Sequence, residues 1–88
     1  MSITIEIAPY LRPFIENRTS VVVGGTNIQE CIGELVTQFP GFKEWLFDSQ
    51  GTLKVLIIVN GKVIPQQGFN LKLGDNDHIR IIMPLDEG

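Results

Sequence analysis

Residues 53–64 read LKVLIIVNGKVI: a nearly continuous apolar run, a two-residue turn and a short apolar return. Asn60-Gly61 is the strongest short-range hairpin signal, because Asn and Gly readily adopt the positive φ angles that such a turn needs. The β-branched residues on either side of it favour extended backbone. This stretch therefore predicts two antiparallel strands joined at residues 60–61.

Three other segments have the pattern of strands. Residues 3–7 alternate apolar and polar side chains, which is typical of a strand with one face against a core. Residues 18–23 are rich in β-branched side chains and end at Gly24-Gly25, so they predict a strand antiparallel to the first. Residues 78–82 follow a Gly-Asp turn and predict the last strand.

One long helix is expected between the second and third strands. Thr26 and Gln29 have the spacing of a capping box, in which the Thr hydroxyl accepts from a free backbone amide. Apolar residues then recur at helical spacing from Ile28 to Phe39, and Pro40-Gly41 ends the run. Residues 42–47 are rich in aromatic side chains and are expected to form a short helical turn over one end of the core.

This order of elements predicts an α+β fold. A mixed sheet of four to five strands, with one main helix across one face, buries the apolar stripe of the helix. No repeat or linker interrupts residues 1–88, so we expect a single domain.

Composition excludes several classes of function. The chain has 88 residues and a net charge of -3, which lacks the basic footprint that nucleic acids or anionic membranes attract. The lone Cys31 cannot form an internal disulfide, and the N-terminus shows no basic leader followed by an apolar run. We therefore expect a cytoplasmic protein that binds neither nucleic acid nor membrane.

The apolar run of the third strand also predicts a partner-binding surface. Because a helix covers only one face of a sheet, Leu56 and Ile58 are expected on the open face, with Arg80 and Ile82 extending the same surface. The alternative is that residues 42–47 cover Leu56 and Ile58.

The remaining reactive side chains have simpler interpretations. Cys31 falls on the apolar stripe of the helix and is expected to be a core residue. His78 lies near Asp75 and Asp77, but a metal site needs several converging ligands, so no metal is assigned.

Short motifs follow one another in a fixed order over nearly the whole chain. These motifs are Gly25-Thr26-Asn27-Ile28, Phe39-Pro40-Gly41-Phe42, Val59-Asn60-Gly61-Lys62, Leu71-Lys72-Leu73-Gly74-Asp75 and Met83-Pro84. In these motifs and their order, the chain resembles the MoaD/ThiS family of ubiquitin-like β-grasp sulfur carriers.

This resemblance implies a function centred on the C-terminus. In the family, an ATP-dependent enzyme of the ubiquitin-activating type adenylates the terminal carboxylate, and sulfur transfer yields a thiocarboxylate for molybdopterin-, thiamine- or cysteine-type biosynthesis. Gly88 is then the reacting residue, at the end of a flexible tail of residues 83–88.

The implied partners are the adenylating enzyme, which uses the ATP, and the large subunit of a sulfur-accepting synthase. The chain itself would be a carrier rather than an enzyme and would bind no cofactor. The tail residues that would contact these partners are Met83, Pro84, Leu85, Asp86 and Glu87.

Glu87 departs from the family pattern, in which the chain usually ends in Gly-Gly. A glutamate adds bulk and a negative charge beside a carboxylate that must approach ATP. The change is compatible with a dedicated activating partner, or with a carrier that has lost conjugation. A β-grasp protein-binding module, or a small subunit of a larger enzyme, is therefore the alternative function.

Overall fold

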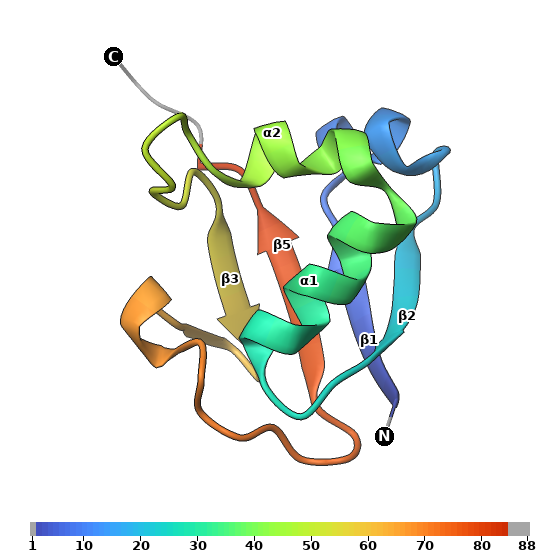
Figure 1. Ribbon diagram of the computed structural model, residues 1–88. Helices are drawn as coiled ribbons and strands as arrows, with labels where there is room; N and C mark the ends of the chain where they lie inside the picture. Colours follow the sequence, from blue (N-terminus) through green and yellow to red (C-terminus); the bar gives the residue numbers. More distant parts are fainter. Residues whose placement is uncertain (1, 85–88) are drawn as a thin grey trace.

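The computed structural model describes residues 2–84. Within them the chain forms a five-stranded mixed sheet in the order β2-β1-β5-β3-β4 (Figure 1). The central pair, β1 and β5, is parallel, and the other neighbouring strands are antiparallel. The strands are β1 (Ser2–Ile7), β2 (Ser20–Gly24), β3 (Leu56–Val59), β4 (Lys62–Val63) and β5 (His78–Ile82).

Helix α1 (Ile28–Gln38) crosses one face of this sheet (Figure 1). Its apolar side chains pack against the inward-facing residues of the strands, so the helix covers one face of the sheet, as expected. Burial removes these side chains from water and is the main source of stability. The fully buried side chains of the core include Ile3, Ile5, Ile7, Cys31, Leu35, Ile57, Ile79 and Ile81. The predicted α+β, ubiquitin-like β-grasp fold is confirmed.

The start of α1 differs from the prediction. Asn27, not Thr26, is the N-cap residue, and its side chain accepts a hydrogen bond of 2.8 Å from the amide of Glu30. The carboxylate of Glu30 in turn accepts from the amide and hydroxyl of Thr26. The capping box that pairs Thr26 with Gln29 is therefore wrong. Both caps fit the sequence rule, and Asn27 has the extended backbone and the side-chain hydrogen bond to the Glu30 amide that an N-cap needs.

The hairpin at residues 60–61 is confirmed. Asn60 has φ 51° and Gly61 has φ 85°, the left-handed values that a tight turn between antiparallel strands requires. Strand β3 begins at Leu56 rather than Leu53, which instead makes an isolated bridge with Phe47.

Short helices close the end of the sheet at which β1 and β5 finish (Figure 1). They are η1 (Pro9–Ile15), η2 (Pro40–Phe42) and α2 (Lys43–Leu46), while η3 (Gln66–Gly68) follows β4. Phe14 of η1 stacks on Trp45 of α2, with ring centroids 4.3 Å apart. Strand β1 ends at Ile7, and the prolines at residues 9 and 13 lie within a helical turn that buries Leu11 and Ile15. No pattern in the sequence predicted this turn.

Two negative findings apply to residues 2–84. No helix in this range has the length and apolar character that a membrane span needs. Nor does the range bring together three or more His, Cys, Asp or Glu side chains in a cluster that could hold a metal ion.

Candidate functional site

The face of the sheet opposite α1 carries a surface that we call the apolar patch: Leu56, Ile58, Val63 and Ile82. Leu56 lies opposite Ile82, and Ile58 lies opposite Val63, so the four side chains project from neighbouring strands on the same side. Leu56 is 36% exposed and Val63 is 56% exposed. The predicted outward position of Leu56 and Ile58 is therefore confirmed, and Val63 is a further member of the patch that the sequence pattern did not predict.

Residues 42–47 do not cover this patch. Phe42 and Leu46 are fully buried within the core, and α2 lies across the end of the sheet (Figure 1). The alternative in which this segment covers Leu56 and Ile58 is wrong. An uncovered aliphatic cluster on a small domain is typical of a protein-interaction surface.

A row of charged side chains borders the patch. Arg80 lies opposite Ile58 on one side and Glu6 on the other. Its Nε atom is 3.0 Å from Oε1 of Glu6, and His78 Nε2 is 3.6 Å from the same oxygen. The hydrogen bond from Arg80 is the main cause that lowers the pKa of Glu6 below its ordinary value, so this carboxylate is ionised at neutral pH. Arg80 thus lies beside the patch, as the sequence predicts.

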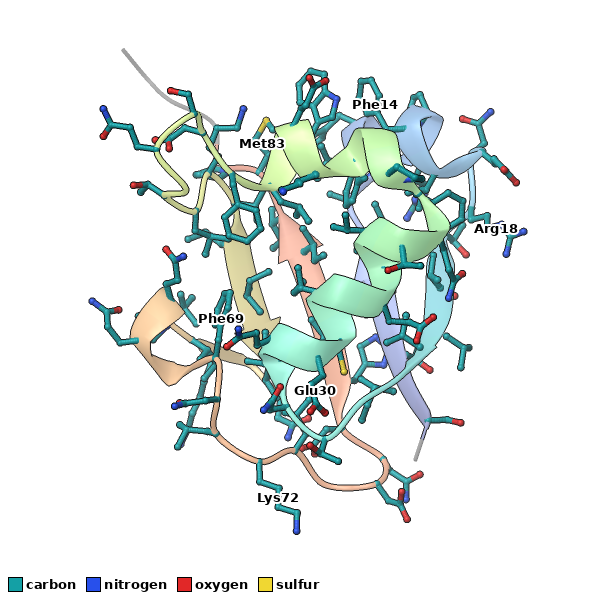
Figure 2. The ribbon with its side chains drawn as sticks, viewed as in Figure 1. Phe14, Arg18, Glu30, Phe69, Lys72 and Met83 are labelled. Carbon is teal, nitrogen blue, oxygen red and sulfur yellow. The ribbon has the colours of Figure 1, made fainter. Side chains whose placement is uncertain are left out.

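The chain leaves the sheet at Met83, and a hydrogen bond fixes this point. The hydroxyl of Tyr10 donates to the carbonyl oxygen of Met83 at 2.6 Å. Met83, which we expected to belong to the tail, is half-buried against the core (Figure 2). Pro84 is exposed. Tyr10 had no signal in the sequence, because its partner is 73 residues away.

Four predicted site residues lie outside the residues that the structure describes. They are Leu85, Asp86, Glu87 and Gly88.

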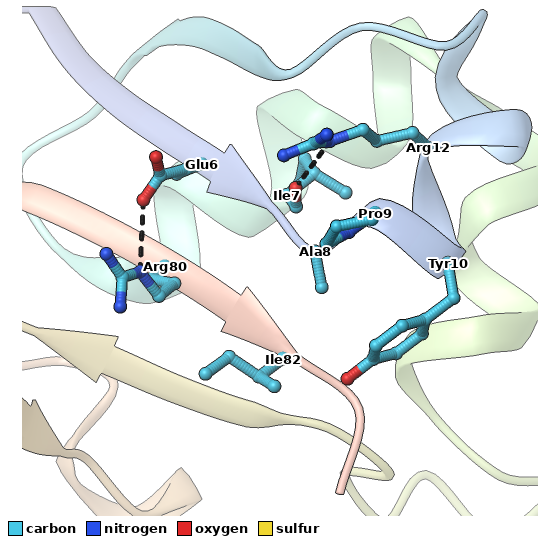
Figure 3. A pocket seen from close by; sticks show the side chains of 8 residues that line it. All are labelled: Glu6, Ile7, Ala8, Pro9, Tyr10, Arg12, Arg80 and Ile82. Atoms are coloured by element: carbon cyan, nitrogen blue, oxygen red, sulfur yellow. Dashed lines mark hydrogen bonds and ion pairs between the residues drawn. The ribbon is translucent and has the colours of Figure 1, made fainter.

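A groove of about 320 Å³ lies between η1 and β5 (Figure 3). We call it the Arg12 groove, and its walls include Ala8, Pro9, Tyr10, Arg12, Arg80 and Ile82. Backbone hydrogen bonding sets its shape, since the amide of Ala8 donates to the carbonyl of Ile81 and so holds the start of η1 beside β5. The Nε of Arg12 donates to the carbonyl oxygen of Ile7 at 2.9 Å, which fixes the direction of the guanidinium.

Cys31 lies in the core, as the sequence predicts, and His78 is the first residue of β5. Cys31 is fully buried, and burial raises the pKa of its thiol, with the charge of Glu30 adding to the effect. A neutral, buried thiol is a poor nucleophile. His78 faces Glu6 on the open face of the sheet rather than joining Asp77, whose carboxylate accepts from Gly74 and Asn60.

Comparison with known proteins places this fold in a class. No protein-family model matches the sequence, and no curated protein does so either. Among solved structures, CysO of Mycobacterium tuberculosis is 28% identical, covers 94% of this chain and 99% of its own, and has a TM-score of 0.80. SAMP1 of Haloferax volcanii covers 100% of both chains at 16% identity with a TM-score of 0.84. A chain from the complex of subunits 1 and 2 of the molybdopterin-converting factor of Helicobacter pylori 26695 covers 100% of both at 20% identity with a TM-score of 0.68.

These matches define the chain as a ubiquitin-like β-grasp protein. It shares its fold with CysO and with the molybdopterin-converting factor chain, in agreement with the resemblance that the sequence motifs indicate.

Proposed function

We propose that this chain is a sulfur carrier whose reacting group is the carboxylate of Gly88. The observation that carries the proposal is the continuity between the apolar patch and the base of the tail. Leu56 lies opposite Ile82, the last residue of β5, and Met83 and Pro84 follow at once. A carrier must dock its body so that its terminus reaches the partner's reaction centre, and a docking surface beside the tail meets this need. The structural likeness to CysO and to the molybdopterin-converting factor chain supports the proposal.

The chemistry takes place on the tail. The Gly88 carboxylate attacks the α-phosphorus of ATP and displaces pyrophosphate, which gives an acyl adenylate. Sulfide then displaces AMP and leaves a thiocarboxylate. If the donor is a persulfide, its outer sulfur displaces AMP to give an acyl disulfide, and a second thiol cleaves the S–S bond to release the thiocarboxylate and a disulfide. Activation is necessary because a carboxylate is a poor electrophile, and a terminal glycine has no Cβ to obstruct the approach. ATP belongs to the partner's site, so the chain acts as a carrier and not as a catalyst.

Two partners follow from this proposal. One is an adenylating enzyme of the ubiquitin-activating type. The other is the large subunit of a synthase that accepts the sulfur, and the match to a chain from a complex of subunits 1 and 2 supports it. The sulfur would serve cofactor biosynthesis of the molybdopterin or thiamine type, or cysteine biosynthesis, in the cytoplasm.

A second candidate function is favoured by Glu87. A protein-binding module or small enzyme subunit would keep the fold and the apolar patch without activation of its terminus. Glutamate in place of the family's penultimate glycine is compatible with such a loss.

Release of pyrophosphate distinguishes the two candidates. The chain is incubated with ATP and with each ubiquitin-activating-type enzyme of its source organism, and the Glu87→Gly variant is run beside it. If the chain is a sulfur carrier, adenylation of the wild-type chain releases pyrophosphate. A binding module releases none, and activity that appears only in the Glu87→Gly variant favours that alternative.

A further inference from the structure

The Arg12 groove combines positive charge with an apolar floor. Arg12 and Arg80 stand on opposite sides of it, and Ala8, Pro9 and Ile82 line the part of the groove toward Tyr10 (Figure 3). It opens on the same end of the molecule as Met83, because Tyr10 both lines the groove and bonds the Met83 carbonyl.

Arg12 carries a positive charge that no carboxylate of the described residues answers. Its Nε atom binds the carbonyl oxygen of Ile7, a neutral group, and no ion pair within residues 2–84 includes it. This bond holds the planar guanidinium in place, and only one of its five N–H donors is used by it.

The second guanidinium of the groove is partly neutralised. Arg80 pairs with Glu6, whose carboxylate also faces His78. The lining of the groove therefore carries two guanidinium groups, Arg12 and Arg80, and one carboxylate, Glu6, although the whole chain has a net charge of -3. A local excess of positive charge on an acidic protein favours an acidic ligand.

The lining also limits the shape of that ligand. Proline and aliphatic side chains on the floor contact apolar groups, while a fixed guanidinium binds a carboxylate through two parallel N–H donors. A short extended peptide with one Asp or Glu beside an aliphatic residue meets both requirements.

We propose that the Arg12 groove is a docking site for an acidic peptide segment of the protein that receives the tail. This inference rests on the proposed function, which supplies such a protein. Ile82 belongs to both the groove and the apolar patch, so one partner can cover the two surfaces together. The groove would then fix the rotation of the carrier on its partner, while the patch supplies most of the buried area.

Peptide binding tests the groove without reference to sulfur chemistry. The ¹⁵N-labelled chain is titrated with acetyl-Leu-Glu-Leu-amide and, at matched ionic strength, with acetyl-Leu-Gln-Leu-amide. The acidic peptide is expected to shift the Nε–Hε signal of Arg12 and the amide signals of Ala8 and Ile82. Equal shifts from both peptides would overturn the proposal.

Matched variants locate the charge that matters. Arg12→Gln keeps a side-chain donor but removes the cation, and it should weaken binding of the acidic peptide about fivefold. Arg80→Gln should also weaken binding of the acidic peptide. This second variant tests the groove even if Arg12→Gln disturbs the fold. The control is Lys72→Gln, which removes the same charge at the opposite end of the molecule (Figure 2) and should leave binding unchanged. An equal loss in all three variants would show nonspecific attraction and contradict the proposal.

A truncated chain tests whether the acidic residues of the same chain, rather than a partner, occupy the groove. If the acidic residues of the same chain filled the groove, a chain ending at Pro84 would bind the peptide more tightly than the full chain, and the proposed partner segment would be wrong. If the peptide results hold but no adenylating enzyme acts on Gly88, the groove stands and the sulfur-carrier function fails.

Discussion

The hydroxyl of Tyr10 donates a hydrogen bond of 2.6 Å to the carbonyl oxygen of Met83 and joins residues 73 positions apart. Tyr10 comes from η1 and Met83 follows β5, so this bond ties the first turn after β1 to the last segment that the structure describes. The base of the tail is thus held at a defined place beside the apolar patch. If that placement serves docking, its loss will affect binding to a partner more than stability.

Tyr10→Phe removes this bond and keeps the ring. A net hydrogen bond is worth about 1 kcal/mol, so we expect KM for the chain in the adenylation reaction to rise about fivefold with kcat unchanged. Because Tyr10 is 44% exposed, urea unfolding should change by no more than about 1 kcal/mol. An unaltered KM would show that the bond has no part in docking.

Leu56→Thr tests the apolar patch. Threonine keeps a strand-compatible side chain but removes aliphatic surface, and we expect the dissociation constant for the activating enzyme to rise about tenfold. Val22→Thr is the matched control, because Val22 is 60% exposed on the same face of the sheet but lies on β2, away from the patch. Calorimetric titration of both variants decides the matter. Equal losses would mean that the patch is not the docking surface.

Asn27→Ala tests the start of α1. Loss of an N-cap side chain costs about 1 kcal/mol, so its urea midpoint should fall. Gln29→Ala should cost less than about 0.5 kcal/mol, because alanine is an excellent helix former and no hydrogen bond of the Gln29 side chain is seen in residues 2–84. A larger loss of stability in Gln29→Ala than in Asn27→Ala would instead support the Thr26–Gln29 capping box.

Acid should destabilise the fold through three carboxylates. The pKa of Glu6 is lowered chiefly by the hydrogen bond from Arg80, that of Glu30 by the backbone amide of Thr26, and that of Asp77 by the side chain of Asn60. A carboxyl group whose pKa is lower in the folded state stabilises that state at pH values above its ordinary pKa. This ordinary pKa is 4.5 for glutamate and 3.8 for aspartate. That stability is lost as the pH falls through the lowered values.

Urea midpoints measured from about pH 6 to about pH 2 should therefore decrease toward acid. Glu30→Gln keeps an acceptor oxygen for Thr26 but cannot titrate, so its midpoint should depend less steeply on pH. A pH dependence identical to that of the wild-type chain would show that Glu30 makes no contribution.

Local patterns in the sequence were sufficient for most of the fold. The alternation at Ile3, Ile5 and Ile7, the Asn60-Gly61 turn and the apolar stripe of α1 each depend on neighbouring residues, and each is confirmed. The outward direction of Leu56 followed from the same two-residue period.

The parts that the sequence did not reveal depend on residues far apart in the chain. The Tyr10–Met83 bond and the Arg12 groove exist because β1 and β5 pair in parallel and bring η1 beside the end of β5. The helix start was wrong for a different reason. Two overlapping capping patterns, Thr26 with Gln29 and Asn27 with Glu30, satisfy the same local rule, and in the structure α1 begins after Asn27, whose side chain accepts from the Glu30 amide.

The central claim is that the Gly88 carboxylate becomes a thiocarboxylate. Its most direct test is the intact mass of the chain after incubation with ATP, a sulfur donor and its activating enzyme, followed by fragmentation of the C-terminal peptide. We expect sulfur to replace one oxygen, and we expect the change to lie on Gly88. An unchanged mass with every ubiquitin-activating-type enzyme of the source organism, or sulfur carried elsewhere, as on Cys31, would contradict it.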